Sequence, residues 1–260
     1  MLVETMSKVR TLILRAPGTN CDAETAFAFQ KAGATTFLVH VGKLIRHEER
    51  LCDYQIMVIP GGFTYGDDIS AGKVLANELR LKLGEDVERF IDKGGLILGI
   101  CNGLQVMVKA GILPGPRTGQ AMLTLMANDS GRFECRWVHL SVSKENPCVF
   151  TKGIELMYLP VAHAEGKVVA GSAILPRLNV VLYYTDENGN REVGYPHNPN
   201  GSIANIGGIC DASGRVFALM PHPERCIRDT QHPQWTRQKP VKYGDGFQIF
   251  LNAVRWAQAL

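Results

Sequence analysis

Short apolar runs alternate with longer amphipathic segments through the first part of the chain. Buried strands are predicted over residues 9–16, 35–41, 56–59 and 96–99, and helices over 22–32, 71–83 and 85–93. Asn20 or Asp22 is the expected N-cap of the first helix. Strands that alternate with helices are typical of βαβ units. The pattern therefore predicts an α/β fold with an open, mostly parallel sheet flanked by helices.

The pattern changes after Gly111. Residues 132–142 alternate imperfectly between apolar and polar side chains, which is typical of an antiparallel strand. Further short strands are predicted over residues 149–150, 155–160, 166–169, 180–184, 205–210 and 216–220. We therefore expect an additional antiparallel β portion, either inserted into the parallel sheet or appended to it.

The chain is expected to form one domain over residues 9–260, because no break in composition and no internal repeat divides it. Within that domain, residues 229–260 form a C-terminal extension. It starts as a polar loop and ends in a helix from about Gly246. The apolar side chains at helical spacing in this helix are Phe247, Phe250, Leu251, Val254 and Trp256. They predict a face that packs on the sheet.

Composition narrows the classes of function. Hydrophobic residues make up 45% and charged residues 20%, as in an ordinary packed protein. A net charge of +3 from 28 basic and 25 acidic residues argues against nucleic acid or an anionic membrane as partner. Seven cysteines without any C-x-x-C pair argue against a zinc site and a disulfide framework. No secretory signal or membrane-length apolar run is evident, so a cytoplasmic location is expected.

Cys101 is the first candidate for chemistry. It lies between Gly99 and Gly103, directly after a buried strand and before a predicted helix. This G-x-C-x-G spacing is the thiol version of the nucleophile elbow, in which small neighbours permit a sharp strand-to-helix turn. A thiol at a helix N-terminus is favoured as thiolate. On these residues alone a protease, another hydrolase and a redox sensor all stay open.

His222 and Glu224 are the candidate partners of this thiol. A nucleophilic cysteine needs a base, and the base needs a group that orients it. Prolines on both sides of His222 fix its backbone, and Glu224 shares its face if the segment is extended. The glycine-rich loop over residues 60–68 follows a strand, as Cys101 does, so both belong at the carboxyl edge of the sheet. A glycine N–H of this loop is expected to point at a developing oxyanion.

These motifs resemble the class I glutamine amidotransferases, through the elbow at residues 99–105 and His222-Pro223-Glu224. More specific stretches resemble one branch of that family, the glutaminase subunits of phosphoribosylformylglycinamidine synthase. They lie at residues 15–22, 60–67, 128–136, 162–166, 198–202 and 220–225 and span nearly the whole chain. The resemblance implies a flavodoxin-like class I amidotransferase sheet.

The resemblance also implies roles for residues. Cys101 would attack the side-chain amide of L-glutamine, His222 would move the proton, and Glu224 would orient His222. Backbone N–H groups of Gly62 and Asn102 would form the oxyanion hole. The residues implied to bind the substrate are Gly62, Phe63, Asn102, Gln105, His163 and Glu165. No metal and no cofactor is expected on this chain.

Partners are implied as well. Ammonia would pass to a large synthetase subunit that carries ATP and Mg, with a small third subunit in the complex. There, formylglycinamide ribonucleotide would become formylglycinamidine ribonucleotide in de novo purine biosynthesis. Two alternatives stay open: a glutaminase of this fold that serves another acceptor, and a non-catalytic redox or chaperone relative. The second gives no reason to keep both His222 and Glu224.

Two positions depart from the family pattern. Ala164 stands where the family usually has glycine, in Ala-His-Ala-Glu-Gly. If that position needs a positive φ, alanine would cost about 1 kcal/mol or more. Residues 68–72 lack an arginine that many relatives carry, which puts a partner contact from that position in doubt.

Overall fold

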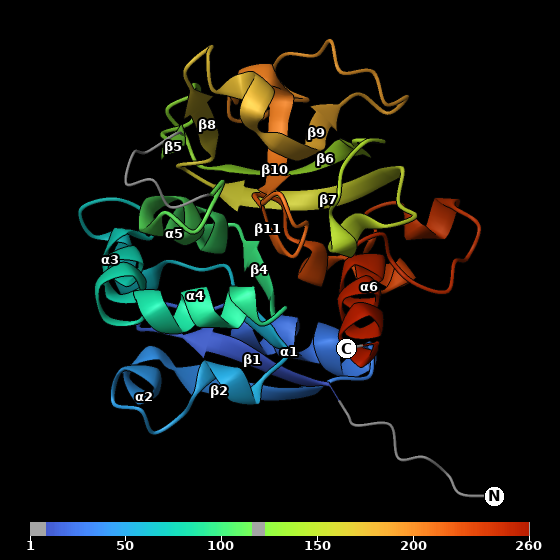
Figure 1. Cartoon of the computed structure of the whole chain (residues 1–260). Helices are drawn as coiled ribbons and strands as arrows, with labels where there is room; N and C mark the ends of the chain where they lie inside the picture. Colours follow the sequence, from blue (N-terminus) through green and yellow to red (C-terminus); the bar gives the residue numbers. More distant parts are fainter. Residues whose placement is uncertain (1–8, 116–122, 260) are drawn as a thin grey trace, which may run out of the picture.

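One nine-stranded sheet runs through the molecule (Figure 1). The computed structural model describes residues 9–115 and 123–259. The strand order is β2-β1-β3-β4-β11-β10-β9-β6-β7. The first five strands are parallel: β2 (Thr35–His40), β1 (Arg10–Arg15), β3 (Ile56–Ile59), β4 (Leu96–Ile100) and β11 (Val216–Leu219). The predicted fold class is confirmed.

The antiparallel portion continues the same sheet. Each of its strands pairs antiparallel with its neighbours: β10 (Ile206–Cys210), β9 (Asn179–Thr185), β6 (Glu134–Val142) and β7 (Leu156–His163). A separate antiparallel pair is formed by β5 (Leu123–Met126) and β8 (Lys167–Ala170). The β-rich half is thus appended at β11, and the small pair lies beside it in the upper part of Figure 1.

Helices cover both faces of the parallel strands. The crossover from β1 to β2 uses α1 (Asp22–Lys31), and α6 (Phe247–Gln258) packs beside it. The chain moves the other way from β3 to β4, so right-handed crossovers place the next helices on the opposite face. These are α3 (Lys73–Lys82), α4 (Gly84–Asp92) and α5 (Asn102–Ala110). A short helix, α2 (Val41–Ile45), follows β2.

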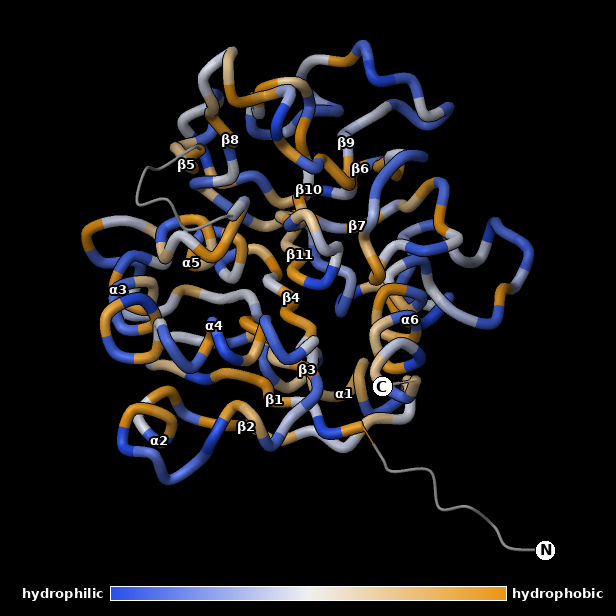
Figure 2. Tube along the Cα trace, viewed as in Figure 1, coloured by the Kyte–Doolittle hydropathy of each residue, from blue (hydrophilic) through white to orange (hydrophobic). Residues whose placement is uncertain are grey.

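The core is densest around the central parallel strands. Every residue of β3 and β4 is buried, so these strands read as continuous apolar runs rather than alternating ones. The hydropathy colouring in Figure 2 shows them as hydrophobic segments in the middle of the molecule. On one face, the rings of Phe29 in α1 and Phe250 in α6 meet edge to face with centroids 5.1 Å apart. No helix of the described chain is long and apolar enough to cross a membrane.

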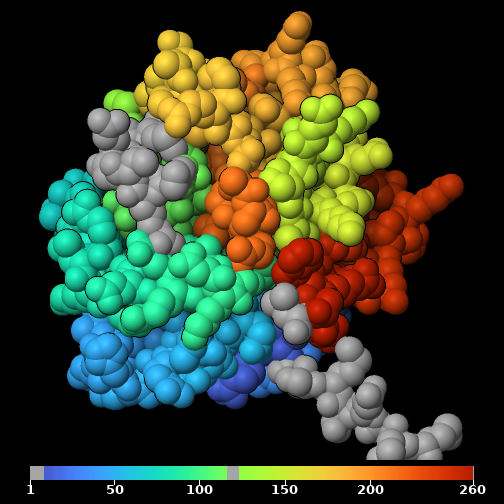
Figure 3. All heavy atoms as spheres, in the orientation of Figure 1, coloured from blue at the N-terminus to red at the C-terminus, as the bar shows by residue number. Residues whose placement is uncertain are grey.

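The C-terminal segment reaches back to the β-rich half before it enters α6. It contains two 3-10 turns, Asp229–Gln231 and Trp235–Arg237. The His232 ring lies 5.2 Å from the Tyr158 ring, and the backbone N–H of Tyr158 donates to Asp245 at 2.8 Å. In Figure 3 this segment projects in red from one side of the molecule, next to the yellow-green segment.

Two local expectations were wrong, and one helix was not predicted. The strand predicted at residues 149–150 is a 3-10 turn, Val149–Thr151, because Asn146 accepts from the N–H of Cys148 and starts a turn there. The first helix begins at Asp22 after Cys21, which makes no side-chain cap. The sequence also gave no signal for α2, which is five residues long and too short for a period to be read.

Candidate active site

The elbow forms where β4 ends and α5 begins. Cys101 has φ 52° and ψ −103°, a strained conformation for a residue with a side chain. A Cβ on Gly103 would overlap the carbonyl oxygen of Ile59 in β3, and one on Gly99 would overlap the sulfur of Met107. The absence of side chains at these two glycines therefore allows the start of α5 to pack directly against the sheet. This is the physical reason for the G-x-C-x-G spacing.

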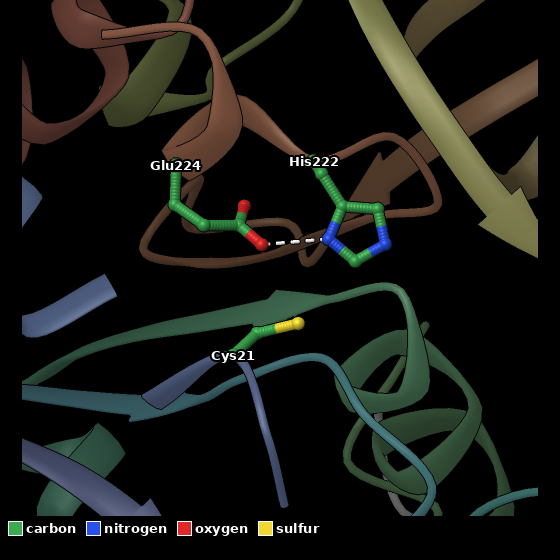
Figure 4. Close-up of side chains that lie close together, drawn as sticks. All are labelled: Cys21, His222 and Glu224. Carbon is green, nitrogen blue, oxygen red and sulfur yellow. Dashed lines mark hydrogen bonds and ion pairs between the residues drawn. The ribbon is translucent and has the colours of Figure 1, made fainter. Parts of the chain in front are cut away.

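His222 and Glu224 lie directly after β11, the strand beside β4. His222 Nδ1 and Glu224 Oε1 are 2.6 Å apart, and both side chains are almost completely buried (Figure 4). The backbone N–H of His222 donates to the carbonyl of Pro160 in β7 at 2.9 Å. The predicted contact is present, but it is made through a 3-10 turn, Pro223–Arg225, and not through an extended segment.

The thiol and the imidazole face one another at the carboxyl edge of the sheet. The Sγ of Cys101 lies 3.6 Å from the carbonyl oxygen of Ala162. Burial lowers the pKa of His222, but the Glu224 carboxylate and the Cys101 thiol raise it by more than burial lowers it. The pKa of His222 therefore lies well above its ordinary value. Among the described residues, no hydrogen bond is made to His222 Nε2. The imidazole can therefore carry a proton beside the thiol, with Nε2 free to give and take it.

The glycine-rich loop after β3 lies against the turn that follows β1. The N–H of Cys21 donates to the carbonyl of Gly61 at 3.2 Å, and the N–H of Phe63 donates to Gly18 at 3.0 Å. Gly62, between them, has φ 140°. Bonds on both sides thus fix the loop without using the Gly62 N–H, which suits the expected role of an oxyanion donor.

Asn102 joins this loop to the elbow. Its Oδ1 accepts from the hydroxyl of Thr64 at 2.6 Å and from the Thr64 N–H at 3.3 Å. Its Nδ2 donates to Asp67 at 3.0 Å. Because Asn102 is the first residue of α5, its own N–H has no acceptor within the helix. The side chain is therefore structural, while the N–H fits the second oxyanion donor.

Gln105 and Glu165 are hydrogen-bonded to each other. Gln105 Nε2 donates to the backbone carbonyl of Glu165 at 2.6 Å, and its Oε1 accepts from Asn102 at 2.9 Å. The Glu165 carboxylate accepts from the N–H of Ala71 and lies 3.6 Å from Lys109 Nζ. The structure brings both residues to the elbow, but in this state both are bonded within the protein.

Lys109 and Asp67 belong to the same network, and sequence reasoning missed both. Lys109 Nζ donates to the Ser70 hydroxyl and to the Ala71 carbonyl at 3.0 and 2.6 Å. Asp67 accepts from the N–H of Gly72 at 3.2 Å. Burial lowers the pKa of Lys109 and raises that of Asp67. Lys109 is the only charged residue of the helix after the elbow, and this was the available signal.

His163 is held by a buried amide. Its Nδ1 lies 3.1 Å from Asn128 Oδ1, which also accepts from the N–H of Gly166 at 3.0 Å. Burial, followed by the charge of His222, lowers the pKa of His163 to about 4. The ring is therefore neutral near pH 7, and its Nε2 is buried with no partner among the described residues.

The two remaining sequence questions concern Phe63 and Ala164. Phe63 is half-exposed, with its ring centroid 6.4 Å from that of Phe133. Ala164 does not have a positive φ, so alanine causes no backbone strain at this position. Its carbonyl accepts from the N–H of Asn128 at 2.8 Å, as a glycine carbonyl would.

Two surface hollows lie away from this site. Two cavities of about 450 and 300 Å³ lie near the starts of β3 and β4, between α4 and its neighbours. The carboxyl ends of those strands carry the thiol, which is 5% exposed. The thiol is therefore almost completely buried among the described residues.

Comparison with known proteins agrees with this geometry. The sequence model of the CobB/CobQ-like glutamine amidotransferase domain matches residues 8–257. Phosphoribosylformylglycinamidine synthase subunit PurQ of Dehalococcoides mccartyi is 57% identical over 253 residues, covering 97% of this chain and 99% of the relative. The PurQ subunit of Methanococcus maripaludis strain S2 / LL is 42% identical over 264 residues, with 95% and 97% covered.

The chain belongs to the PurQ family of glutamine amidotransferases. A solved structure, PurLQS from Thermotoga maritima, has a matching chain with TM-score 0.74 and 32% identity, covering 96% of this chain and 99% of that one. The resemblance inferred from the motifs is confirmed.

Proposed function

We propose that this chain is the glutaminase subunit of a phosphoribosylformylglycinamidine synthase. One observation carries the proposal: a buried His222–Glu224 couple at 2.6 Å faces a cysteine held at φ 52° between a strand and a helix. PurQ relatives that match nearly the full chain support the same assignment. A redox or chaperone role would not need the carboxylate-oriented imidazole.

The chemistry follows from the geometry. Cys101 attacks the amide carbon of glutamine as thiolate, and the negative oxygen that forms is met by the N–H groups of Gly62 and Asn102. His222 gives the thiol proton to the leaving nitrogen, so that ammonia departs and a γ-glutamyl thioester remains. Water then attacks the thioester with His222 as base, which releases glutamate and restores the thiol. Glu224 keeps the imidazole aligned and stabilises its charge.

Glutamine recognition is proposed for the residues around the elbow. Gln105 on α5 and Glu165 would exchange their mutual contact for contacts with the substrate. The neutral His163 donates its Nδ1–H to Asn128, so its unpartnered Nε2 can accept a hydrogen bond from the substrate. The half-exposed ring of Phe63 would cover the apolar part of the substrate at the rim.

Ammonia needs a second protein. We assign the ATP-dependent step, from formylglycinamide ribonucleotide to formylglycinamidine ribonucleotide in de novo purine biosynthesis, to a large synthetase subunit that carries ATP and Mg. A small third subunit completes the proposed complex. The solved PurLQS assembly supports a partnered subunit. We propose a cytoplasmic location and no cofactor on this chain, whose residues 9–260 act as one domain with the extension at 229–260.

Labelling with an irreversible glutamine analogue tests the proposal. The complex with the encoded synthetase is treated with the analogue, digested and mapped by mass spectrometry. We expect one label per chain on Cys101, with protection by excess glutamine. The exposed thiols of Cys52 and Cys135 serve as internal controls, because a generally reactive reagent would modify them first. Labelling that spares Cys101 would reject the assignment.

A further inference from the structure

A second cysteine lies beside the His222–Glu224 couple. Cys21 is 1% exposed and sits in the turn between β1 and α1, far from Cys101 in the sequence. Its sulfur, one nitrogen of His222 and one carboxylate oxygen of Glu224 all lie within 4.8 Å of one another. Figure 4 shows the Cys21 side chain pointing toward the imidazole from the side opposite the 222–224 segment. The glutaminase mechanism above gives this thiol no role.

The backbone of Cys21 is fixed at both ends. Its N–H donates to the carbonyl of Gly61 in the oxyanion loop at 3.2 Å. Its carbonyl accepts from the hydroxyl of Thr25 at 2.6 Å and from the Thr25 N–H at 3.2 Å. The side chain is therefore presented from a rigid turn, so its sulfur has a defined position against the imidazole.

The sulfur is also fixed by its own contacts. Arg225 Nη2 donates to Cys21 Sγ at 3.1 Å, and Sγ lies 3.3 Å from Asn20 Oδ1. The same arginine reaches Glu24 on α1, with 3.8 Å between charged atoms. A guanidinium this close to the sulfur disfavours a cation in the cluster, although thiol, imidazole and carboxylate could otherwise hold one. The arrangement fits a role toward the imidazole better than a metal site.

Packing leaves the imidazole little freedom. A Cβ on Gly61 would lie 2.7 Å from His222 Cε1 and 3.2 Å from Cys21 Sγ, so the Gly61 backbone packs against both the ring and the sulfur. Glu224 holds the ring at Nδ1. The sulfur thus lies within 4.8 Å of one ring nitrogen while the carboxylate holds Nδ1, and together they limit the freedom of the ring.

We propose that Cys21 is a positioning residue of the active site, whose arginine-anchored sulfur holds the His222 imidazole in line between Glu224 and Cys101. This inference rests on the proposed glutaminase function. Removal of the sulfur should leave the ring mobile and its protonated form less favoured, since a hydrogen-bonding group near the ring is lost.

Charged and titratable groups reach His222 from several elements. They are Glu224 and Arg225 on its own segment, Cys101 at the elbow, Cys21 before α1, and His163 at the end of β7. Burial opposes the imidazolium, whereas Glu224 and the two thiols favour it. Loss of Cys21 subtracts one favourable group, and it also frees Arg225 to move toward Glu224. Both changes lower the pKa of His222.

The test is a proton titration of His222. Histidine labelled at ¹³Cε1 is introduced, the His222 signal is assigned by its loss in His222→Gln, and its shift is followed against pH. We expect Cys21→Ala to lower the midpoint by about half a pH unit or more. Cys21→Ser, which can still accept from Arg225, should recover most of that shift. Cys148→Ala, which removes a buried thiol hydrogen-bonded to Cys210, is the matched control and should leave the midpoint unchanged.

Each outcome decides. Equal midpoints in wild type and Cys21→Ala would overturn the inference, as would a shift of the same size in Cys148→Ala. If Cys21→Ala does not fold, Arg225→Lys is used instead, because it removes the hydrogen bond from the guanidinium to the Cys21 sulfur. This variant must also lower the midpoint of the His222 titration. The glutamine-hydrolysis pH profile of the complex is measured alongside. Absence of glutamine hydrolysis by the wild-type complex would reject the proposed function. The titration would still test, independently, whether Cys21 influences His222.

Discussion

Gly61→Ala tests the geometry of the site without replacing any reacting group. Gly61 does not have a positive φ, so alanine suits its backbone. The new methyl would lie 2.7 Å from His222 Cε1, whereas ordinary contact begins at 3.4 Å. Relief therefore needs a displacement of about 0.7 Å, either of the imidazole or of the loop that presents the Gly62 N–H. The imidazole and the Gly62 N–H both act on the reacting atoms in the proposed mechanism.

The expected loss is large for one methyl group. A misplacement of about 1 Å can lower an enzymatic rate about 100-fold. We expect glutamine-dependent kcat/KM to fall about 10- to 100-fold, equivalent to about 1.4–2.7 kcal/mol of transition-state stabilisation. Synthesis from added ammonium should be unchanged, since it does not use this site.

The assay is product formation by the reconstituted complex, with glutamine or ammonium as nitrogen donor. Gly171→Ala is the matched control, because a Cβ there meets nothing within 4 Å. Thermal unfolding of each chain checks that the fold is intact. Retention of more than half the glutamine-dependent rate by Gly61→Ala would refute the argued contact between loop and imidazole.

Three further outcomes are expected. Glu224→Gln removes the main group that raises the pKa of His222, so the alkaline fall of glutamine hydrolysis should move to lower pH, as a pH–rate profile will show. Gly103→Ala, whose methyl would overlap the Ile59 carbonyl, should lower the free energy of unfolding in urea by about 3 kcal/mol or more. Asn128→Ala leaves buried donors unpaired and should cost about 2–3 kcal/mol by the same measurement; a loss below about 0.5 kcal/mol would contradict its assigned bonds.

Sequence periodicity predicted most of the parallel half. The predicted bounds of β3 match the structure, because Pro60 stops the strand and four apolar residues fill it. The elbow and the His222–Glu224 couple were also predictable. The spacing of the glycines reflects the lack of room for side chains at the turn. The histidine and the glutamate are two residues apart, so their contact is local in the sequence.

The rest depends on contacts between distant segments. Nothing near Cys21 in the sequence points to His222, since the fold brings them together across more than two hundred residues. The network of Lys109 and Asp67 with Glu165 likewise joins three segments. A strand near β8 was predicted, but β5 was not, and their pairing joins segments that are far apart in the sequence.

The central claim is that Cys101 makes ammonia from glutamine for a partner enzyme. The most direct test compares glutamine and ammonium as nitrogen donors for the reconstituted complex, with wild type and Cys101→Ala. The account predicts that Cys101→Ala abolishes glutamine-dependent synthesis and keeps the ammonium-dependent rate at the wild-type level. Equal loss of both rates, or glutamine-dependent synthesis that survives the substitution, would contradict it.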